Sequence, residues 1–350
     1  MNELLFLSLS SLLFATMILL GWRYLPNDRF QILATVPVRR DELGRWQGIN
    51  FTWYGLLLAT ATVIAIFFVF MLCRAAGLAL APLLALLVAI IGLCVPAARW
   101  VARLVEKKQY TFTIGGAFFC GLVATPFIIL LINLGCRLLG HPTLPMQVVL
   151  AALGIGYILG EGLGRLACLS FGCCYGKPLG QCGRVACRLL QPVAVVFTAP
   201  TKKAVYEGGL AGVQLLPIQG ITSVLYTATA LVGCHLFLQG HFRSAFLLCL
   251  LVSQVWRVIS EIFRADFRGF ASISAYQWMG LAAILYGSLI SLTVPLPALA
   301  NPDISLGLSL LLNPLLILGL KGLWFALFLH FGRSMVTGAT LTFEVHHQAI

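Results

Sequence analysis

The stretch FTWYGLLLATATVIAIFFVFML (residues 51–72) decides the fold of this protein. It carries no charged side chain, and as a helix it is long enough to cross the hydrocarbon core of a bilayer. Because lipid offers an exposed backbone no hydrogen-bond partner, such a run must be helical. The chain contains nine such apolar runs, the last long enough to tilt or break: residues 4–20, 51–72, 80–96, 114–134, 146–160, 218–238, 244–262, 278–294 and 304–331.

The composition agrees with this pattern. Of the 350 residues, 60% are hydrophobic and 10% are charged, which excludes an ordinary water-soluble domain. The predicted fold class is therefore an all-α polytopic membrane protein. No Lys or Arg precedes the first run, and the GWRYLP that follows it (21–26) offers no small-residue cleavage site. We therefore expect a retained membrane anchor and not a secretory signal.

The formal net charge of +12 is explained by membrane topology. No basic, aromatic-interleaved polar domain is present to bind nucleic acid. When successive connections are assigned alternately to the two sides of the membrane, Arg74, Arg137 and Arg243 fall on one side, and Arg257 and Lys321 fall inside apolar runs. All the other Lys and Arg residues fall on the opposite side. The positive-inside rule predicts that this basic side faces the cytoplasm.

The eleven cysteines divide into two groups. Six lie in or at the ends of apolar runs, where Cys packs as a small hydrophobe. The other five cluster in one connecting segment: Cys168, Cys173, Cys174, Cys182 and Cys187. Their spacing does not match a zinc pair of the C-x2-C kind, and no His lies nearby. Packing of small side chains is therefore favoured over a metal or disulfide site.

Arg257 lies in the middle of a predicted helix, LVSQVWRVISEIFRADFRG (251–269). Glu261 follows at i+4 and Arg264 one turn later, so all three share a face and Arg257 and Glu261 can neutralise each other. A charge inside hydrocarbon usually lines a polar cavity. The alternative is a structural ion pair near the helix end, with its side chains reaching toward water.

Arg165 follows the glycine-rich stretch GIGYILGEGLG (154–164). Its glycines allow close approach by a neighbouring helix or a ligand. The pattern is not a dinucleotide fingerprint, since no strand precedes it and the spacing differs. Arg165 and Arg257 are suited to grip a phosphate through bidentate hydrogen bonds. In a membrane protein the obvious phosphate is a phospholipid headgroup.

A series of motifs along the chain resembles the prolipoprotein diacylglyceryl transferase family: FTWYGLLLA (51–59), IGGAFFCGLV (114–123), GEGLGRLACLSFGCCYGKP (160–178), LPIQGI (216–221), SQVWRVISEIFRADFRG (253–269) and SAYQWMGL (274–281). The resemblance implies a divergent member with two additional transmembrane helices. Its expected parts are an N-terminal anchor with a basic interfacial segment (1–50), a seven-helix transferase-like core (51–297) with a polar head segment (161–217), and a C-terminal transmembrane helix with a short tail (298–350).

The resemblance also implies an activity in the bacterial cytoplasmic membrane. The family moves the diacylglyceryl group from phosphatidylglycerol to the cysteine thiol of a prolipoprotein lipobox, releases glycerol phosphate, and uses no metal or cofactor. Arg165 and Arg257 resemble its two essential arginines, which would hold the phosphate and stabilise the leaving group. The expected substrate-binding residues are Tyr54, Gly115, Gly116, Cys168, Cys173, Tyr175, Gly176, Gln219 and Glu261.

The sequence departs from the family at polar positions. Ile114 replaces a histidine, Leu216 and Thr222 replace the ends of a His-Pro-x-Gln-x-x-Glu motif, and Cys168 and Cys173 replace an asparagine and an acid. A plausible base for the acceptor thiol is thus missing. This keeps open a non-enzymatic or re-targeted relative that binds phosphatidylglycerol or another anionic phospholipid. A weaker hypothesis is a thiol-redox or metal protein built on the clustered cysteines. The family orientation, with the head segment outside, conflicts with the charge count.

Overall fold

Nine helices in the described part of the chain are long and apolar enough to cross a membrane. The computed structural model describes residues 2–106, 114–266, 273–298 and 301–350. The nine helices are α1 (Glu3–Tyr24), α2 (Trp53–Ala75), α3 (Leu80–Glu106), α4 (Ile114–Leu138), α5 (Met146–Phe171), α8 (Ile218–Leu238), α9 (Phe242–Phe263), α10 (Ala275–Thr293) and α12 (Pro314–Gly332). The prediction of a helical, polytopic membrane protein is confirmed.

The ninth apolar run, expected to tilt or break, is broken at Asn313. It forms the short helix α11 (Ile304–Leu308) and a 3₁₀ turn (Ser309–Leu312) before α12 begins at Pro314. Proline is suited to the first turn of a helix because its missing N–H would have no partner there. The Asn313 side chain accepts a hydrogen bond from Leu316 N (3.0 Å) and caps the new helix.

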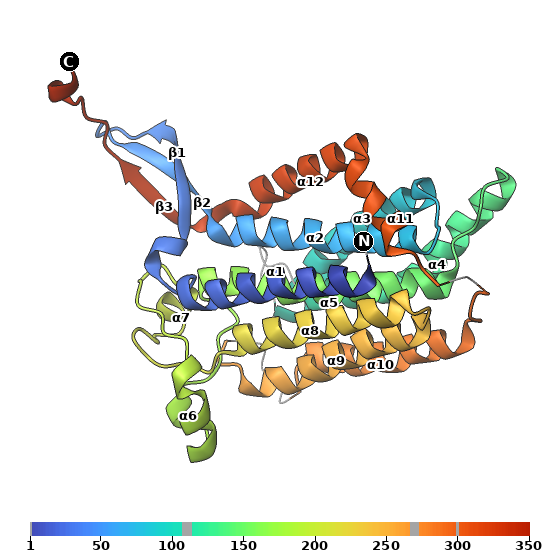
Figure 1. Ribbon diagram of the computed structural model, residues 1–350. Helices are drawn as coiled ribbons and strands as arrows, with labels where there is room; N and C mark the ends of the chain where they lie inside the picture. The colour runs from blue at the N-terminus through green and yellow to red at the C-terminus, as the bar shows by residue number, and fades with distance from the viewer. Residues whose placement is uncertain (1, 107–113, 267–272, 299–300) are drawn as a thin grey trace.

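Helix α5 runs through the middle of the bundle and packs against α2, α8 and α9 (Figure 1). Its glycines make this packing close. A Cβ at Gly160 would lie 2.9 Å from Ala65 Cβ in α2, and one at Gly162 would lie 2.9 Å from Thr227 Oγ1 in α8. The expectation that this glycine-rich stretch admits neighbouring helices is therefore met at these two positions.

Helix α5 is longer than its apolar run. The run was predicted to end at residue 160, but the helix continues to Phe171, so Arg165 and Cys168 lie inside it. Gly172, with φ +73°, ends it in the left-handed conformation that glycine adopts readily. Charged and small residues after position 160 lower the local hydropathy without interrupting the backbone hydrogen bonds, which explains the shorter prediction.

A three-stranded antiparallel sheet stands at one end of the bundle (Figure 1). It consists of β1 (Ile32–Arg40), β2 (Trp46–Thr52) and β3 (Arg333–Leu341), in that order. Strand β2 leads directly into α2, and β3 follows α12, so the sheet joins the two ends of the chain. The sequence predicts an interfacial segment and a short tail here. The pairing of β2 with β3, which joins residues almost 300 positions apart, has no local sequence signal.

The segment between α5 and α8 folds into a head with its own small core. It contains two 3₁₀ turns (Leu179–Gln181 and Gln191–Val193) and the short helices α6 (Arg184–Leu190) and α7 (Lys203–Tyr206). Buried Lys202 fastens the head to the bundle, because its Nζ donates to the carbonyls of Ser170 (2.7 Å), Asn27 (3.0 Å) and Leu25 (3.3 Å). The Ser170 carbonyl belongs to the last turn of α5, which a cation stabilises.

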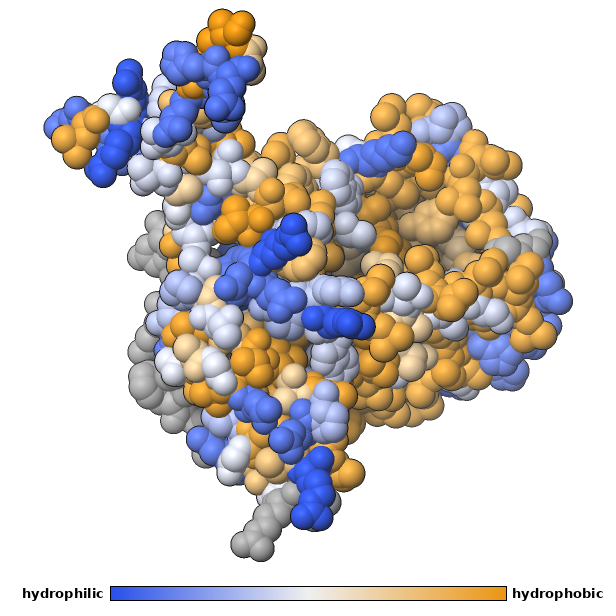
Figure 2. Space-filling view, turned by 60° about the vertical axis from the view of Figure 1, so that its left-hand side comes forward, coloured by the Kyte–Doolittle hydropathy of each residue, from blue (hydrophilic) through white to orange (hydrophobic). Residues whose placement is uncertain are grey.

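The head, the sheet and the C-terminal residues all lie at one end of the bundle (Figure 1). Blue, hydrophilic side chains gather on this end, whereas orange, hydrophobic side chains cover the flank of the bundle (Figure 2). The head and the sheet, which carry many of the basic residues, thus lie on one side of the bundle, as the alternating assignment predicted for these two segments.

Candidate active site

Arg165 and Arg257 meet at one carboxylate, that of Glu161. Arg165 Nη2 donates to Glu161 Oε1 (2.5 Å), and Arg257 Nη2 donates to Glu161 Oε2 (2.7 Å) and Oε1 (2.9 Å). Arg257 Nη2 also donates to the Tyr157 hydroxyl (2.7 Å), which in turn donates to Glu161 Oε2. We call Tyr157, Glu161, Arg165 and Arg257 the arginine cluster. The first three share one face of α5 at i, i+4 spacing, and Arg257 comes from α9.

The cluster corrects one prediction and adds two residues. Among the residues that the structure describes, the carboxylate paired with Arg257 is Glu161 and not Glu261. Glu161 is deeply buried, with 2% of its side chain exposed. The signal for it was present in the sequence, because an acid four residues before Arg165 shares its helix face. Tyr157 lies one further turn toward the start of the helix. Because it falls inside an apolar run, the sequence pattern did not mark it as a functional residue.

Each arginine has one buried nitrogen for which the described residues offer no hydrogen-bond partner. Arg165 Nε and Arg257 Nε are both buried, and neither has a hydrogen-bond acceptor among the described residues. Buried donors are almost always satisfied by protein, water or a ligand. The two N–H groups therefore mark a position suited to an anionic acceptor.

Gly115 of α4 makes room for the Arg257 side chain. A Cβ at this position would collide with Arg257 Nη1 and lie 3.2 Å from Tyr276 Cδ1. Its neighbour Gly116 is buried. The predicted Gly-Gly pair thus lies beside the arginine cluster, and Gly115 contacts a member of it.

Glu261 belongs to a second group of charges at the end of α9. Arg264 donates to Asp266 through Nε (2.8 Å) and Nη2 (2.7 Å), and to Glu261 through Nη1 (3.4 Å). Ser274 Oγ also donates to Glu261 (3.4 Å). Burial raises the pKa of Asp266 to about 6, although the charge of Arg264 opposes this. The Arg264 backbone pairs with Gly176, which ties this group to the head.

Three of the five clustered cysteines converge: the thiol sulfurs of Cys168, Cys173 and Cys174 all lie within 4.8 Å of one another. We call these three the thiol cluster. Gln219 Nε2 donates to the Cys173 carbonyl (2.9 Å) and so supports it. Tyr54, at the start of α2, packs its ring on Phe171 at the end of α5, with ring centroids 5.5 Å apart.

The other two of the five clustered cysteines, Cys182 and Cys187, lie elsewhere in the head, as does Tyr175. Cys182 lies against the Pro178 carbonyl, and Cys187 packs beside Leu179. Tyr175 is buried in the core of the head, so its ring serves packing there. A Cβ at Gly176 would collide with the Leu216 carbonyl, so this glycine permits a close passage of two chain segments.

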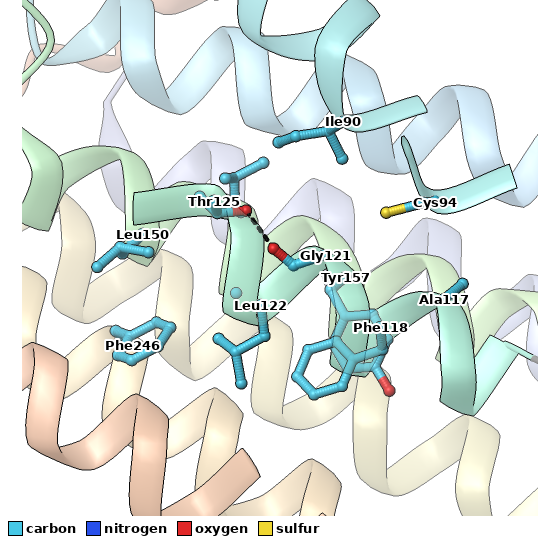
Figure 3. Close-up of a pocket in the computed structure, with 12 residues that line it drawn as sticks. Ile90, Cys94, Ala117, Phe118, Gly121, Leu122, Thr125, Leu150, Tyr157 and Phe246 are labelled. Carbon is cyan, nitrogen blue, oxygen red and sulfur yellow. Dashed lines mark hydrogen bonds between the residues drawn. The ribbon is translucent and has the colours of Figure 1, made fainter. Parts of the chain in front are cut away.

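An apolar pocket of about 240 Å³ adjoins the arginine cluster (Figure 3). It lies between α3, α4, α5 and α9 and is lined by apolar side chains, together with Thr125 and Tyr157. The Tyr157 ring stacks on Phe118, with centroids 4.0 Å apart. Because the Tyr157 hydroxyl accepts from Arg257, one residue contacts both the pocket and the charges.

The fold and the site define a polytopic membrane protein that buries an arginine cluster beside an apolar pocket. The family model for prolipoprotein diacylglyceryl transferase matches residues 43–293, and the chain belongs to this family. The resemblance predicted from the sequence is confirmed. Helices α1 and α12 lie outside the matched residues.

Two curated relatives carry the name phosphatidylglycerol–prolipoprotein diacylglyceryl transferase. The chain is 31% identical over 140 residues to the protein of Clostridium tetani, a match that covers 37% of this chain. It is 29% identical over 143 residues to the protein of Dehalococcoides mccartyi, a match that covers 40% of this chain. The matched segment spans 46% of each relative, about half of its length.

Proposed function

We propose that this protein transfers a diacylglyceryl group from phosphatidylglycerol to the cysteine thiol of a prolipoprotein lipobox, in the bacterial cytoplasmic membrane. Family membership and the names of both relatives support a transferase of lipoprotein biosynthesis. In this proposal Arg165 and Arg257 are the catalytic residues.

The observation that carries the proposal is the charge and hydrogen bonding of the arginine cluster. Two guanidinium groups and one carboxylate leave a net charge of one positive unit, which matches the single negative charge of a phosphodiester. The two unpartnered Nε–H groups supply donors for its oxygens. Charge-assisted bonds from arginine to phosphate are strong and directional.

The apolar pocket supports a lipid over a free phosphate. It begins at Tyr157, whose hydroxyl accepts a hydrogen bond from Arg257, and continues between apolar side chains. A phospholipid has the same arrangement, with a charged phosphate joined to hydrocarbon. We therefore assign the pocket to part of an acyl chain.

The reaction we propose replaces a C–O bond with a C–S bond. The acceptor sulfur attacks the glycerol carbon of the diacylglyceryl group, and the electron pair of the C–O bond leaves with glycerol phosphate. Negative charge then grows on the leaving phosphate, where Arg165 and Arg257 stabilise it in a site that excludes water. The acceptor thiol must lose its proton before it attacks.

A phospholipid-binding protein without transferase activity is the second candidate. It is favoured by the apolar, hydroxyl or thiol side chains at Ile114, Leu216, Thr222, Cys168 and Cys173, where the family resemblance leads us to expect histidine, amide or acidic groups.

A transfer assay in membranes distinguishes the two. We expect labelled phosphatidylglycerol to label the thiol of a lipobox peptide with the wild type, and not with Arg165→Ala or Arg257→Ala. Folded wild-type protein that retains the lipid but labels no peptide would contradict the transferase and support the binding protein.

A further inference from the structure

The thiol cluster has the geometry of a metal site. The Cys168 and Cys174 sulfurs are 3.9 Å apart, and Cys173 contributes a third sulfur within 4.8 Å of both. Zinc–thiolate bonds of about 2.3 Å place the sulfurs of a tetrahedral site roughly 3.8 Å apart. The separation of the Cys168 and Cys174 sulfurs matches this spacing, and the Cys173 sulfur lies near enough to join them around a common cation.

The backbone is shaped to bring these sulfurs together. Gly172 ends α5 with φ +73°, and its N–H and that of Cys173 both donate to the Cys168 carbonyl (2.8 and 3.2 Å). Cys174 then adopts φ +56° and is the one non-glycine residue with positive φ in the described part of the chain. A side chain in this conformation is strained, and such strain is concentrated at functional sites. Buried Gln219 fixes the turn from outside through the Cys173 carbonyl.

We propose that Cys168, Cys173 and Cys174 bind a soft divalent cation such as Zn²⁺ as three thiolates, with the fourth position open for the acceptor thiol. Three protein ligands and one open position are typical of catalytic zinc. This inference rests on the proposed function, which it deepens by supplying the group that activates the acceptor. It also revises the sequence interpretation, which favoured packing because the spacing alone does not resemble a zinc pair.

The charges around the cluster suit such a site. Three thiolates and one Zn²⁺ carry a net charge of −1. Cationic residues come from segments beside the cluster: Arg165 lies three residues before Cys168 in α5, and the Arg264 backbone pairs with Gly176. Lys203 precedes Ala204, whose N–H donates to the Gly172 carbonyl (2.9 Å). These cations offset the negative charge of the complex, which burial would otherwise penalise.

The cation replaces the missing base. A thiol that coordinates zinc is deprotonated outright, so the acceptor S–H releases its proton to water as its sulfur takes the fourth position. That thiolate forms the C–S bond while glycerol phosphate leaves with the C–O electron pair. The product thioether is neutral and therefore a weaker ligand, so it dissociates. The cation keeps its oxidation state throughout.

A disulfide explains the cluster less well. The bond requires sulfurs about 2.05 Å apart, much closer than the 3.9 Å between Cys168 and Cys174. A disulfide would also use only two of the three thiols and would not explain why the third lies beside them.

Metal analysis tests the site without an activity assay. Full-length protein purified from zinc-supplemented cells is expected to carry about one zinc per chain. Cobalt added to the metal-free protein should give strong thiolate-to-cobalt absorption. Cys168→Ser and Cys174→Ser should lose the zinc and the absorption, while Cys234→Ser, a buried cysteine of α8, keeps both. Folded wild type that binds neither metal would overturn the proposal.

A comparison of metal content with transfer separates this proposal from the proposed function. Zinc-dependent transfer supports both. Transfer at the full rate by zinc-free protein overturns the metal site and leaves the transferase standing. Zinc bound by the wild type without any transfer contradicts the transferase, and with it the role of the cation in activating the acceptor.

Discussion

Glu161 of α5 and Arg257 of α9 form an ion pair at 2.7 Å between two neighbouring helices of the bundle. The same carboxylate holds Arg165 at 2.5 Å, so one acid orients both arginines. Leaving either partner alone would bury an uncompensated charge, which is strongly unfavourable. Glu161 is therefore a positioning residue whose own charge lowers the net charge of the cluster to one positive unit, opposite to the charge of one phosphodiester.

Replacing either arginine by lysine should reduce transfer. Arg165→Lys and Arg257→Lys keep the positive charge but lose the planar fork and the free Nε–H. We expect a rate loss of about 10²–10³-fold, as for removal of one donor to a developing anion. The measurement is label transfer from phosphatidylglycerol in membranes. Arg188→Lys, at an exposed position of α6, is the control and should retain full activity.

Replacing Glu161 by glutamine should destabilise the protein and make it dependent on lipid. Loss of the shared carboxylate leaves two buried guanidinium groups without a counter-charge, at a cost of about 3–5 kcal/mol. Added phosphatidylglycerol should recover part of this because its phosphate supplies the missing charge. Thermal unfolding in detergent, with and without the lipid, measures both effects. An equal response of wild type and Glu161→Gln to the lipid would contradict the assignment of the phosphate to this cluster.

Gly115 can be tested against another glycine of the same helix. Gly115→Ala would displace the Arg257 guanidinium, so we expect transfer to fall by about 10–100-fold with little unfolding. In Gly135→Ala the new Cβ meets no described atom within 4 Å, and the helix should gain about 0.5–1 kcal/mol. Equal transfer rates in the two variants would show that Gly115 does not position Arg257.

Lys202 should give the protein a distinctive pH dependence of stability. Burial lowers its pKa from 10.5 to about 8, so between these values the unfolded chain binds more protons than the folded protein. Its contribution to the free energy of unfolding therefore rises as the pH increases above 8.

The variant Lys202→Met tests this prediction. It leaves three carbonyls without their donor and should lose about 2 kcal/mol at neutral pH. The advantage of the wild type should then grow between pH 8 and 9.5, as measured by unfolding in detergent. Lys203→Met keeps the buried amine of Lys202, so its free energy of unfolding should rise above pH 8 as in the wild type. A pH-independent difference between wild type and Lys202→Met would contradict the assignment.

The orientation of the bundle is open to a direct test. Transfer to exported proteins requires the head to face outward, and the C-terminus lies at the same end of the bundle as the head (Figure 1). We therefore expect alkaline phosphatase, which is active only outside the cytoplasm, to be active when fused after Ile350. A fluorescent protein at that position that folds in the cytoplasm would instead follow the positive-inside rule. That result would contradict the proposed acceptor.

The membrane-spanning helices could be predicted from the sequence without any knowledge of the tertiary structure. Each apolar run satisfies its own backbone, so its helical state depends on local composition and length and not on partners. Arg257 was also visible because a charge within an apolar run usually lines a polar cavity, and Arg165 was visible because it directly follows a glycine-rich stretch. The resemblance to the family depended on the same short motifs.

Which side chains come into contact depends on the packing of the helices and could not be predicted from the sequence. Helix packing, and not the i, i+4 spacing of α9, paired Arg257 with Glu161. The pairing of β2 with β3 depends on contacts between distant parts of the chain, which no local periodicity encodes. The thiol cluster needed two left-handed residues after α5 to bring Cys173 and Cys174 back to Cys168. Spacing along a chain limits which residues can meet, but the path of the backbone selects those that do.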